Sequence, residues 1–165
     1  MELRGYRPED CPALGALFYD TVHTVCTGEY DSRQLDAWAP PEGVDLTAWN
    51  ESLSAHLTLV AEEGGAIVGF GDMAPDGYLD RLYVAHTHLR RGVASALCAA
   101  LEAAVPAQRY TTYASRTALP FFLARGWRVV REQTVERRGV TLNNYVMEKE
   151  PSPHGGWPLR PPRNE

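Results

Sequence analysis

The sequence has few cysteines and no familiar metal-ligand spacing. Its three cysteines, Cys11, Cys26 and Cys98, form no Cys-x-x-Cys pair. The chain also has no His-x-x-x-His spacing, so we expect no metal site. An odd number of cysteines without paired spacing favours reduced, structural thiols, as in a cytoplasmic protein.

Long apolar runs and an excess of basic residues are also missing. No run is long enough to span a bilayer, and Met1–Arg7 lacks the apolar segment of a secretory signal. The formal net charge is −5, whereas dedicated nucleic-acid binders are usually basic. We therefore expect a cytoplasmic protein with neither a membrane nor a nucleic-acid partner.

Length and composition indicate one globular domain. Of the 165 residues, 44% are apolar and 22% are charged. This length and this apolar fraction are sufficient for one sizeable core. We expect this domain to cover residues 1–150. Residues 151–165 hold five prolines and a Gly-Gly pair. This Pro-rich C-terminal tail is expected to be flexible.

Apolar periodicity predicts strands and helices along the whole domain. The first part is expected to hold an edge strand and three helices: strand Glu2–Arg7, a helix capped by Asp10 that runs to Val25, a helix from Asp31-Ser32 to Trp38, and helix Leu46–Ser54 capped by Asp45. An antiparallel meander follows, with strands Leu57–Glu62, Ala66–Gly71 and Tyr78–Val84. The remainder is expected as helix Gly92–Val105, strand Arg109–Tyr113, a helix that Ser115 can cap and that ends at Gly126, and strands Trp127–Val135 and Val140–Met147. This order predicts an α+β fold with a mixed sheet and helices on both faces.

The stretch "HLRRGVASAL", residues 88–97, places a basic, glycine-containing turn between a strand and a helix. A helix start has unpaired backbone N–H groups and partial positive charge, and Gly92 lets a ligand approach the backbone. Arg90, Arg91 and Ser95 add charge and a hydroxyl, so the turn is a candidate pyrophosphate site. The alternative is an ordinary helix start with solvated arginines. The turn matches neither the Walker pattern nor the three-glycine dinucleotide pattern.

Two motifs in the sequence resemble those of the GNAT superfamily of acyl-CoA-dependent N-acetyltransferases. The first is a strand ending Leu82-Tyr83-Val84, followed by Leu89-Arg90-Arg91-Gly92-Val93-Ala94 at the start of a helix. The second is Ser115-x-x-Ala118-x-x-Phe121-Phe122-x-x-x-Gly126-Trp127. Further stretches, including Gln34–Pro40 and Asn144–Lys149, are similar to a group of small bacterial members, the YafP-like proteins.

The resemblance implies a GNAT fold, with a central mixed, mostly antiparallel twisted sheet. It also implies direct acetyl transfer from acetyl-CoA, as co-substrate, to an amine. Residues implied in binding the cofactor are Leu82, Tyr83, Val84, Arg90, Arg91, Gly92, Val93, Ala94, Ser95, Ser115, Ala118, Phe121 and Phe122. The N-terminal helical region, with His23, Tyr30 and Trp38, is implied to wall the acceptor pocket.

Three positions depart from the family pattern. Leu89 stands where the family has Gln or Arg, and Ser115 stands where it usually has Asn. Phe122 replaces the Tyr that commonly protonates the leaving thiolate, so the family's acid role does not transfer to residue 122. From the family pattern, we expect Phe122→Tyr, which restores the common residue, to leave activity the same or higher.

Asp80, Tyr78 and Tyr113 are the candidate catalytic residues. Asp80 and Tyr78 share strand parity with Leu82, so these side chains are expected to face one side of the sheet. Asp80 is a candidate base for the amine, and the two tyrosines are candidate proton donors. The alternatives are a surface carboxylate paired with Arg81 and half-buried sheet tyrosines.

The sequence therefore predicts an N-acetyltransferase acting on a small-molecule or peptide amine, as a monomer or homodimer. One alternative is a CoA-binding sensor or regulatory module without turnover, which Phe122 favours. Another is a nucleotide- or phosphate-binding α+β domain that uses the same helix start.

Overall fold

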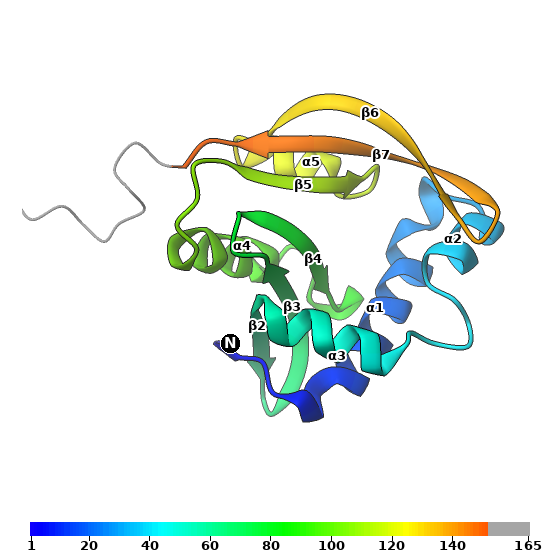
Figure 1. Ribbon diagram of the computed structural model, residues 1–165. Coiled ribbons are helices and arrows are strands. Elements are labelled where there is room, and N and C mark those ends of the chain that lie inside the picture. The colour runs from blue at the N-terminus through cyan, green and yellow to red at the C-terminus, as the bar shows by residue number, and fades with distance from the viewer. Residues whose placement is uncertain (152–165) are drawn as a thin grey trace, which may run out of the picture.

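The computed structural model describes residues 1–151, in which one seven-stranded sheet carries helices on both faces (Figure 1). The predicted tail lies, except for Pro151, outside the described residues. The strands are β1 Glu2–Gly5, β2 Leu57–Glu63, β3 Ala66–Met73, β4 Tyr78–Val84, β5 Tyr110–Ser115, β6 Arg128–Arg137 and β7 Val140–Lys149. The helices are α1 Cys11–Val25, α2 Ser32–Trp38, α3 Leu46–Ala55, α4 Val93–Ala104 and α5 Leu119–Ala124, with short 3-10 turns η1 Pro8–Asp10, η2 Cys26–Gly28 and η3 His86–His88.

The strand order is β1-β2-β3-β4-β5-β7-β6, and the middle of the chain forms the predicted meander. Every neighbouring pair is antiparallel except β4 and β5, which are parallel. A parallel pair needs a crossover, and α4 supplies it between these two strands. The prediction of a mixed, mostly antiparallel sheet is confirmed.

Side-chain alternation along β3 assigns a different set of helices to each face. Phe70 belongs to the core cluster formed with residues of α1, α2 and α3. Gly69 and Gly71 face α4 instead. A Cβ at Gly69 would lie 2.9 Å from Cγ1 of Val93, and one at Gly71 would lie 3.2 Å from Cδ1 of Leu101. The missing side chains therefore let α4 pack directly on the middle of the sheet.

The predicted helix cap at Asp45 is confirmed, and the predicted cap at Asp10 is wrong. Asp31 accepts a hydrogen bond from the backbone N–H of Gln34 at the start of α2, and Asp45 caps α3 in the same way. Asp10 does not cap α1 through its side chain. Its carboxylate binds the guanidinium of Arg4 at 2.8 and 2.9 Å and the backbone N–H of Arg7, because η1 starts one turn earlier.

Some predicted boundaries shift by a few residues. β1 ends at Gly5 rather than residue 7, and β5 runs on to Ser115. Ser115, predicted to cap the next helix, is the last residue of β5, and the N-cap of α5 is Ala118. The Ser115 Oγ still accepts a hydrogen bond from the N–H of Ala118. Among the described residues, no helix is both long and apolar enough to cross a membrane.

Candidate functional site

A crevice opens between β4 and β5 in the middle of the sheet. The two strands pair only at Tyr78–Thr111 and Leu79–Thr112, and then diverge. Beyond Leu79, the edge of β4 that faces β5 has no strand partner within residues 1–151. An unpaired strand edge presents free backbone N–H and C=O groups, so this edge can bind an extended ligand.

A β-bulge lies at the point where the crevice opens. Met73 of β3 is opposite Leu79, but Asp72 is opposite Arg81, which leaves Asp80 as an extra residue in β4. The bulge changes the alternation, so the prediction that Asp80 and Leu82 share a face is wrong. Leu82 packs on the α4 side against Gly71, whereas Tyr78 and Asp80 face the opposite side.

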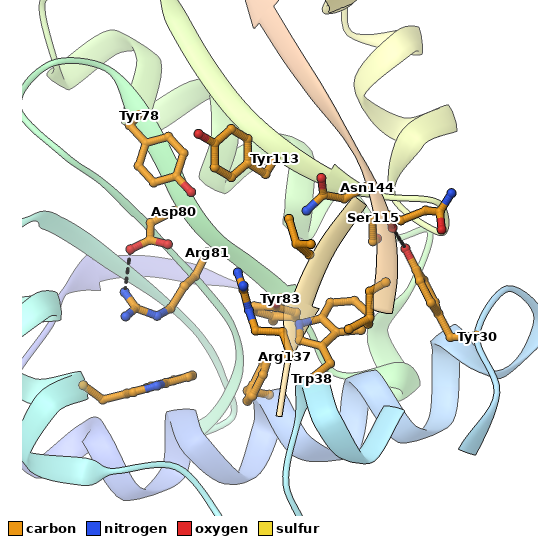
Figure 2. Close-up of a pocket in the computed structure, with 15 residues that line it drawn as sticks. Tyr30, Trp38, Tyr78, Asp80, Arg81, Tyr83, Tyr113, Ser115, Arg137 and Asn144 are labelled. Carbon is orange, nitrogen blue, oxygen red and sulfur yellow. Dashed lines mark hydrogen bonds and ion pairs between the residues drawn. The ribbon is translucent and has the colours of Figure 1, made fainter. Parts of the chain in front are cut away.

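A cavity of about 330 Å³ lies on that opposite side, at the mouth of the crevice (Figure 2). Seven aromatic side chains line it: Phe18, Tyr30, Trp38, Trp49, Tyr78, Tyr83 and Tyr113. The polar and charged lining residues are Asp80, Arg81, Ser115, Arg137, Asn143 and Asn144. The structure thus brings together Tyr78, Asp80, Tyr83, Tyr113 and Ser115, all of which the sequence marked as candidates.

The N-terminal helical region walls this cavity, as the resemblance implied, but not with every expected residue. Tyr30 and Trp38 line it. His23 does not: its ring stacks on Tyr19, and its Nε2 lies 2.8 Å from the carbonyl oxygen of Ala39. His23 therefore has a packing role in α1.

A buried ionic network, which the sequence did not reveal, supports Asp80 from behind. The Asp72 carboxylate is 0% exposed and lies 2.6 Å from Nη1 of Arg81 and 2.7 Å from Nδ1 of His56. Burial raises the pKa of the Asp72 carboxyl, although Arg81 and His56 favour its ionised form. Arg81 also lies 3.4 Å from the Asp80 carboxylate and 4.7 Å above the ring of Trp49. The network fixes Arg81, and Arg81 holds Asp80 at the edge of the cavity.

This network also bears on metal binding. Ligand atoms of His56, Asp72 and Asp80 lie within 4.8 Å of one another, as in a three-residue metal site. The Arg81 guanidinium stands beside both carboxylates, where a metal ion would have to bind. A permanent cation at that place does not fit a divalent ion, so the cluster is an ion-pair network.

The two candidate tyrosines meet above Asp80. Their ring centroids are 5.5 Å apart at a steep angle, and Figure 2 shows Tyr78 above the Asp80 carboxylate. Burial raises the pKa of the Tyr78 hydroxyl to about 12, with a smaller contribution from Asp80. Tyr78 is therefore protonated at neutral pH. Tyr113 is 51% exposed, at the opening of the crevice.

The glycine turn at the start of α4 has the geometry of an anion site. Gly92 is the N-cap, with φ of 82° and no side-chain cap, and a Cβ there would meet nothing within 4 Å. Arg90 also has a positive φ of 61°, and both arginines of the turn are exposed. The first N–H groups of α4 are therefore open to a ligand. None of residues 90–95 lines the cavity. The open edge of β4 connects the turn at the start of α4 with the cavity.

The second motif lies at the far end of β5, and part of it is core. Ala118 and Phe121 are partly buried against the core cluster that contains Leu101 of α4 and Phe122 of α5. Phe122 is 4% exposed and packs on Trp127, with ring centroids 5.2 Å apart. This burial gives no support to contact between Phe122 and a cofactor. Asn144 of β7 lies opposite Ser115 of β5, and its side-chain amide faces the cavity (Figure 2). Its buried Oδ1 accepts no hydrogen bond within residues 1–151.

The burial of Phe122 changes what we expect from Phe122→Tyr. The new hydroxyl would enter a packed apolar cluster, and a buried hydroxyl without a partner costs about 1–3 kcal/mol. We expect the free energy of unfolding to fall by this amount, with no gain in activity. Urea denaturation and turnover assays measure the two effects. A variant as stable as the wild type and more active would place residue 122 at the reacting atoms.

Comparison with known proteins assigns the chain to a family. Residues 26–149 match the family described as acetyltransferase (GNAT) domain. The chain is 35% identical over 152 residues to YafP of Escherichia coli K12, an uncharacterized N-acetyltransferase, covering 92% of this chain and 97% of that protein. The similarity to the YafP-like proteins is thereby confirmed.

Solved structures give the same assignment. A GCN5-related N-acetyltransferase from Rhodopseudomonas palustris superposes with a TM-score of 0.85 at 35% identity, covering 90% of this chain and 94% of that one. The PaiA N-acetyltransferase of Thermoplasma acidophilum, solved in complex with coenzyme A, has the same fold, with a TM-score of 0.73 at 17% identity over 90% and 98% of the two chains. These matches favour the acetyltransferase prediction over the nucleotide-binding alternative. The chain belongs to the GNAT family of acetyltransferases.

Proposed function

We propose that this protein transfers the acetyl group of acetyl-CoA to a primary amine of a small molecule or peptide. The observation that carries this proposal is the continuity of the site. The open edge of β4 leads from the candidate anion site at Gly92 to the cavity beside Asp80. A cofactor with a pyrophosphate at one end and a thioester at the other fits this layout. The fold is shared with an N-acetyltransferase solved with coenzyme A bound.

The cofactor would bind mainly through the backbone. The N–H groups of residues 91–95 would hold the pyrophosphate, assisted by the exposed side chains of Arg90 and Arg91. The pantetheine arm would then lie along the free edge of β4. An N–H near Tyr83 and Val84 would polarise the thioester carbonyl and stabilise the oxyanion that develops there.

The cavity would receive the amine at Asp80. An amine is mostly protonated at neutral pH, so Asp80 takes a proton, directly or through water, and the free amine attacks the carbonyl carbon. The C–S bond breaks as the intermediate collapses and the nitrogen loses its remaining extra proton to water, which gives the acetamide and the CoA thiolate. Tyr78 or Tyr113 supplies the proton to the sulfur, because Phe122 cannot.

The rival function is a CoA sensor that binds the cofactor without turnover. An acceptor screen separates the two: purified protein is mixed with acetyl-CoA and a panel of primary amines, and free thiol and acetylated amine are quantified. We expect thiol release matched by equal amounts of acetylated product for at least one class of amine. Tight acetyl-CoA binding with no transfer to any amine would favour the sensor.

A further inference from the structure

A positive charge at the acceptor cavity lacks an acidic partner. Arg137, at the end of β6, lines the cavity, and Figure 2 shows its guanidinium pointing inward. Its side chain donates a hydrogen bond to the carbonyl oxygen of its neighbour Glu136 at 3.2 Å. No carboxylate within residues 1–151 forms an ion pair with it, whereas the adjacent Arg138 is paired with Glu42. The Arg137 guanidinium therefore has N–H donors that are free to bind a ligand.

The backbone that carries Arg137 is fixed with respect to the cavity. Arg137 is the last β6 residue in register with β7, opposite Val140. The tip of this hairpin is tied to the helical region by the Arg138–Glu42 ion pair and by a 3.1 Å hydrogen bond from Gln34 Nε2 to the carbonyl oxygen of Thr141. The hairpin thus reaches across to α2, as Figure 1 shows, and holds Arg137 at the cavity.

The charges that line the cavity do not cancel once an amine is bound. Only Asp80, Arg81 and Arg137 are charged among the lining residues. Arg81 is neutralised from behind by the buried Asp72. If Asp80 receives the amine, Arg137 faces the same cavity with no counter-charge. Aromatic side chains make up most of the remaining wall.

We propose that the acceptor carries an anionic group, a carboxylate or phosphate, on an apolar body that also bears the amine, and that Arg137 binds this anion. A guanidinium offers a planar pair of donors that matches either group bidentately. The aromatic walls would hold the apolar body between Asp80 and Arg137. This inference rests on the proposed function, because it assigns the amine to Asp80, and it makes Arg137 a specificity-determining residue.

Three probes of similar shape test the inference: benzylamine, para-aminomethylbenzoate and para-aminomethylphenylphosphonate. We expect the wild type to prefer at least one anionic probe to benzylamine by about tenfold or more in kcat/KM, the usual effect of a hydrogen-bonded charge. Arg137→Ala should remove this preference mainly through KM, and Arg137→Glu should reverse it. Arg131→Ala, an exposed arginine of the same strand that does not line the cavity, should keep it. The better anionic probe tells carboxylate from phosphate.

Calorimetric binding of the same probes to the protein saturated with CoA gives a readout that does not need turnover. An Arg137-dependent preference in binding without turnover would support the anion site while contradicting the proposed function for these amines. Turnover without any preference, or a preference that survives in Arg137→Ala, would overturn the anion site and leave the proposed function standing. Failure of both anionic probes to bind would also overturn it.

Discussion

Gly92→Glu should weaken CoA binding by about 100-fold or more while the protein stays folded. The substitution places a carboxylate at the N-cap of α4, where the pyrophosphate would accept hydrogen bonds from the first N–H groups. Losing two hydrogen bonds to a charged group, each worth about 1.5–3 kcal/mol, accounts for an effect of this size. Calorimetric titration with CoA measures it.

A matched control separates charge at the site from backbone strain. Gly92 has φ of 82°, and a side chain there costs about 1–2 kcal/mol of stability wherever such a glycine is replaced. Gly43, in the loop between α2 and α3, has φ of 91° and the same open surroundings. Gly43→Glu should therefore cost similar stability and keep CoA affinity within about twofold, which is at most 0.4 kcal/mol. Equal loss of affinity in both variants, or wild-type affinity in folded Gly92→Glu, would exclude the turn as the site.

Asp80→Asn should lower kcat by about 10²- to 10⁴-fold, the usual range for loss of a general base. Asparagine has nearly the same shape, and Arg81 keeps its 2.6 Å contact with Asp72, so the fold and CoA affinity should stay near those of the wild type. The acidic limb of the pH–rate profile should disappear, because the group that must lose its proton before it acts as a base is gone.

The control for Asp80→Asn is Asp20→Asn, an exposed carboxylate of α1 that does not line the cavity, and its kcat should be unchanged. If Asp80 is instead a structural partner of Arg81, Asp80→Asn will keep both kcat and its pH dependence. That result would assign the deprotonation to water or to another group.

Features that depend on neighbours in the sequence were predicted well. The cap at Asp45 bonds to an N–H group three residues ahead, and the turn at Gly92 follows β4 by a short connection, so local spacing was enough to predict both. The predicted cap at Asp10 is wrong because the Asp10 carboxylate accepts hydrogen bonds from Arg4 of β1 instead.

Features that depend on pairing between distant segments were not predictable. The bulge at Asp80 arises from the register of β3 against β4, and nothing in β4 alone indicates it. The network around Asp72 joins His56, the residue after α3, to residues of β3 and β4. A lone aspartate in the apolar run "AIVGFGDM" was the one sequence signal of it. Arg137 reaches the cavity only because the β6–β7 hairpin extends to α2.

The proposed reaction requires one continuous path from the start of α4 to the acceptor cavity. A crystal structure of the protein with bound CoA tests that path directly. We predict the pyrophosphate on the N–H groups of residues 91–95, the pantetheine along β4 in the crevice, and the sulfur at the cavity beside Asp80 and Tyr78. A pyrophosphate bound away from Gly92, or a sulfur directed away from the cavity, would contradict the account.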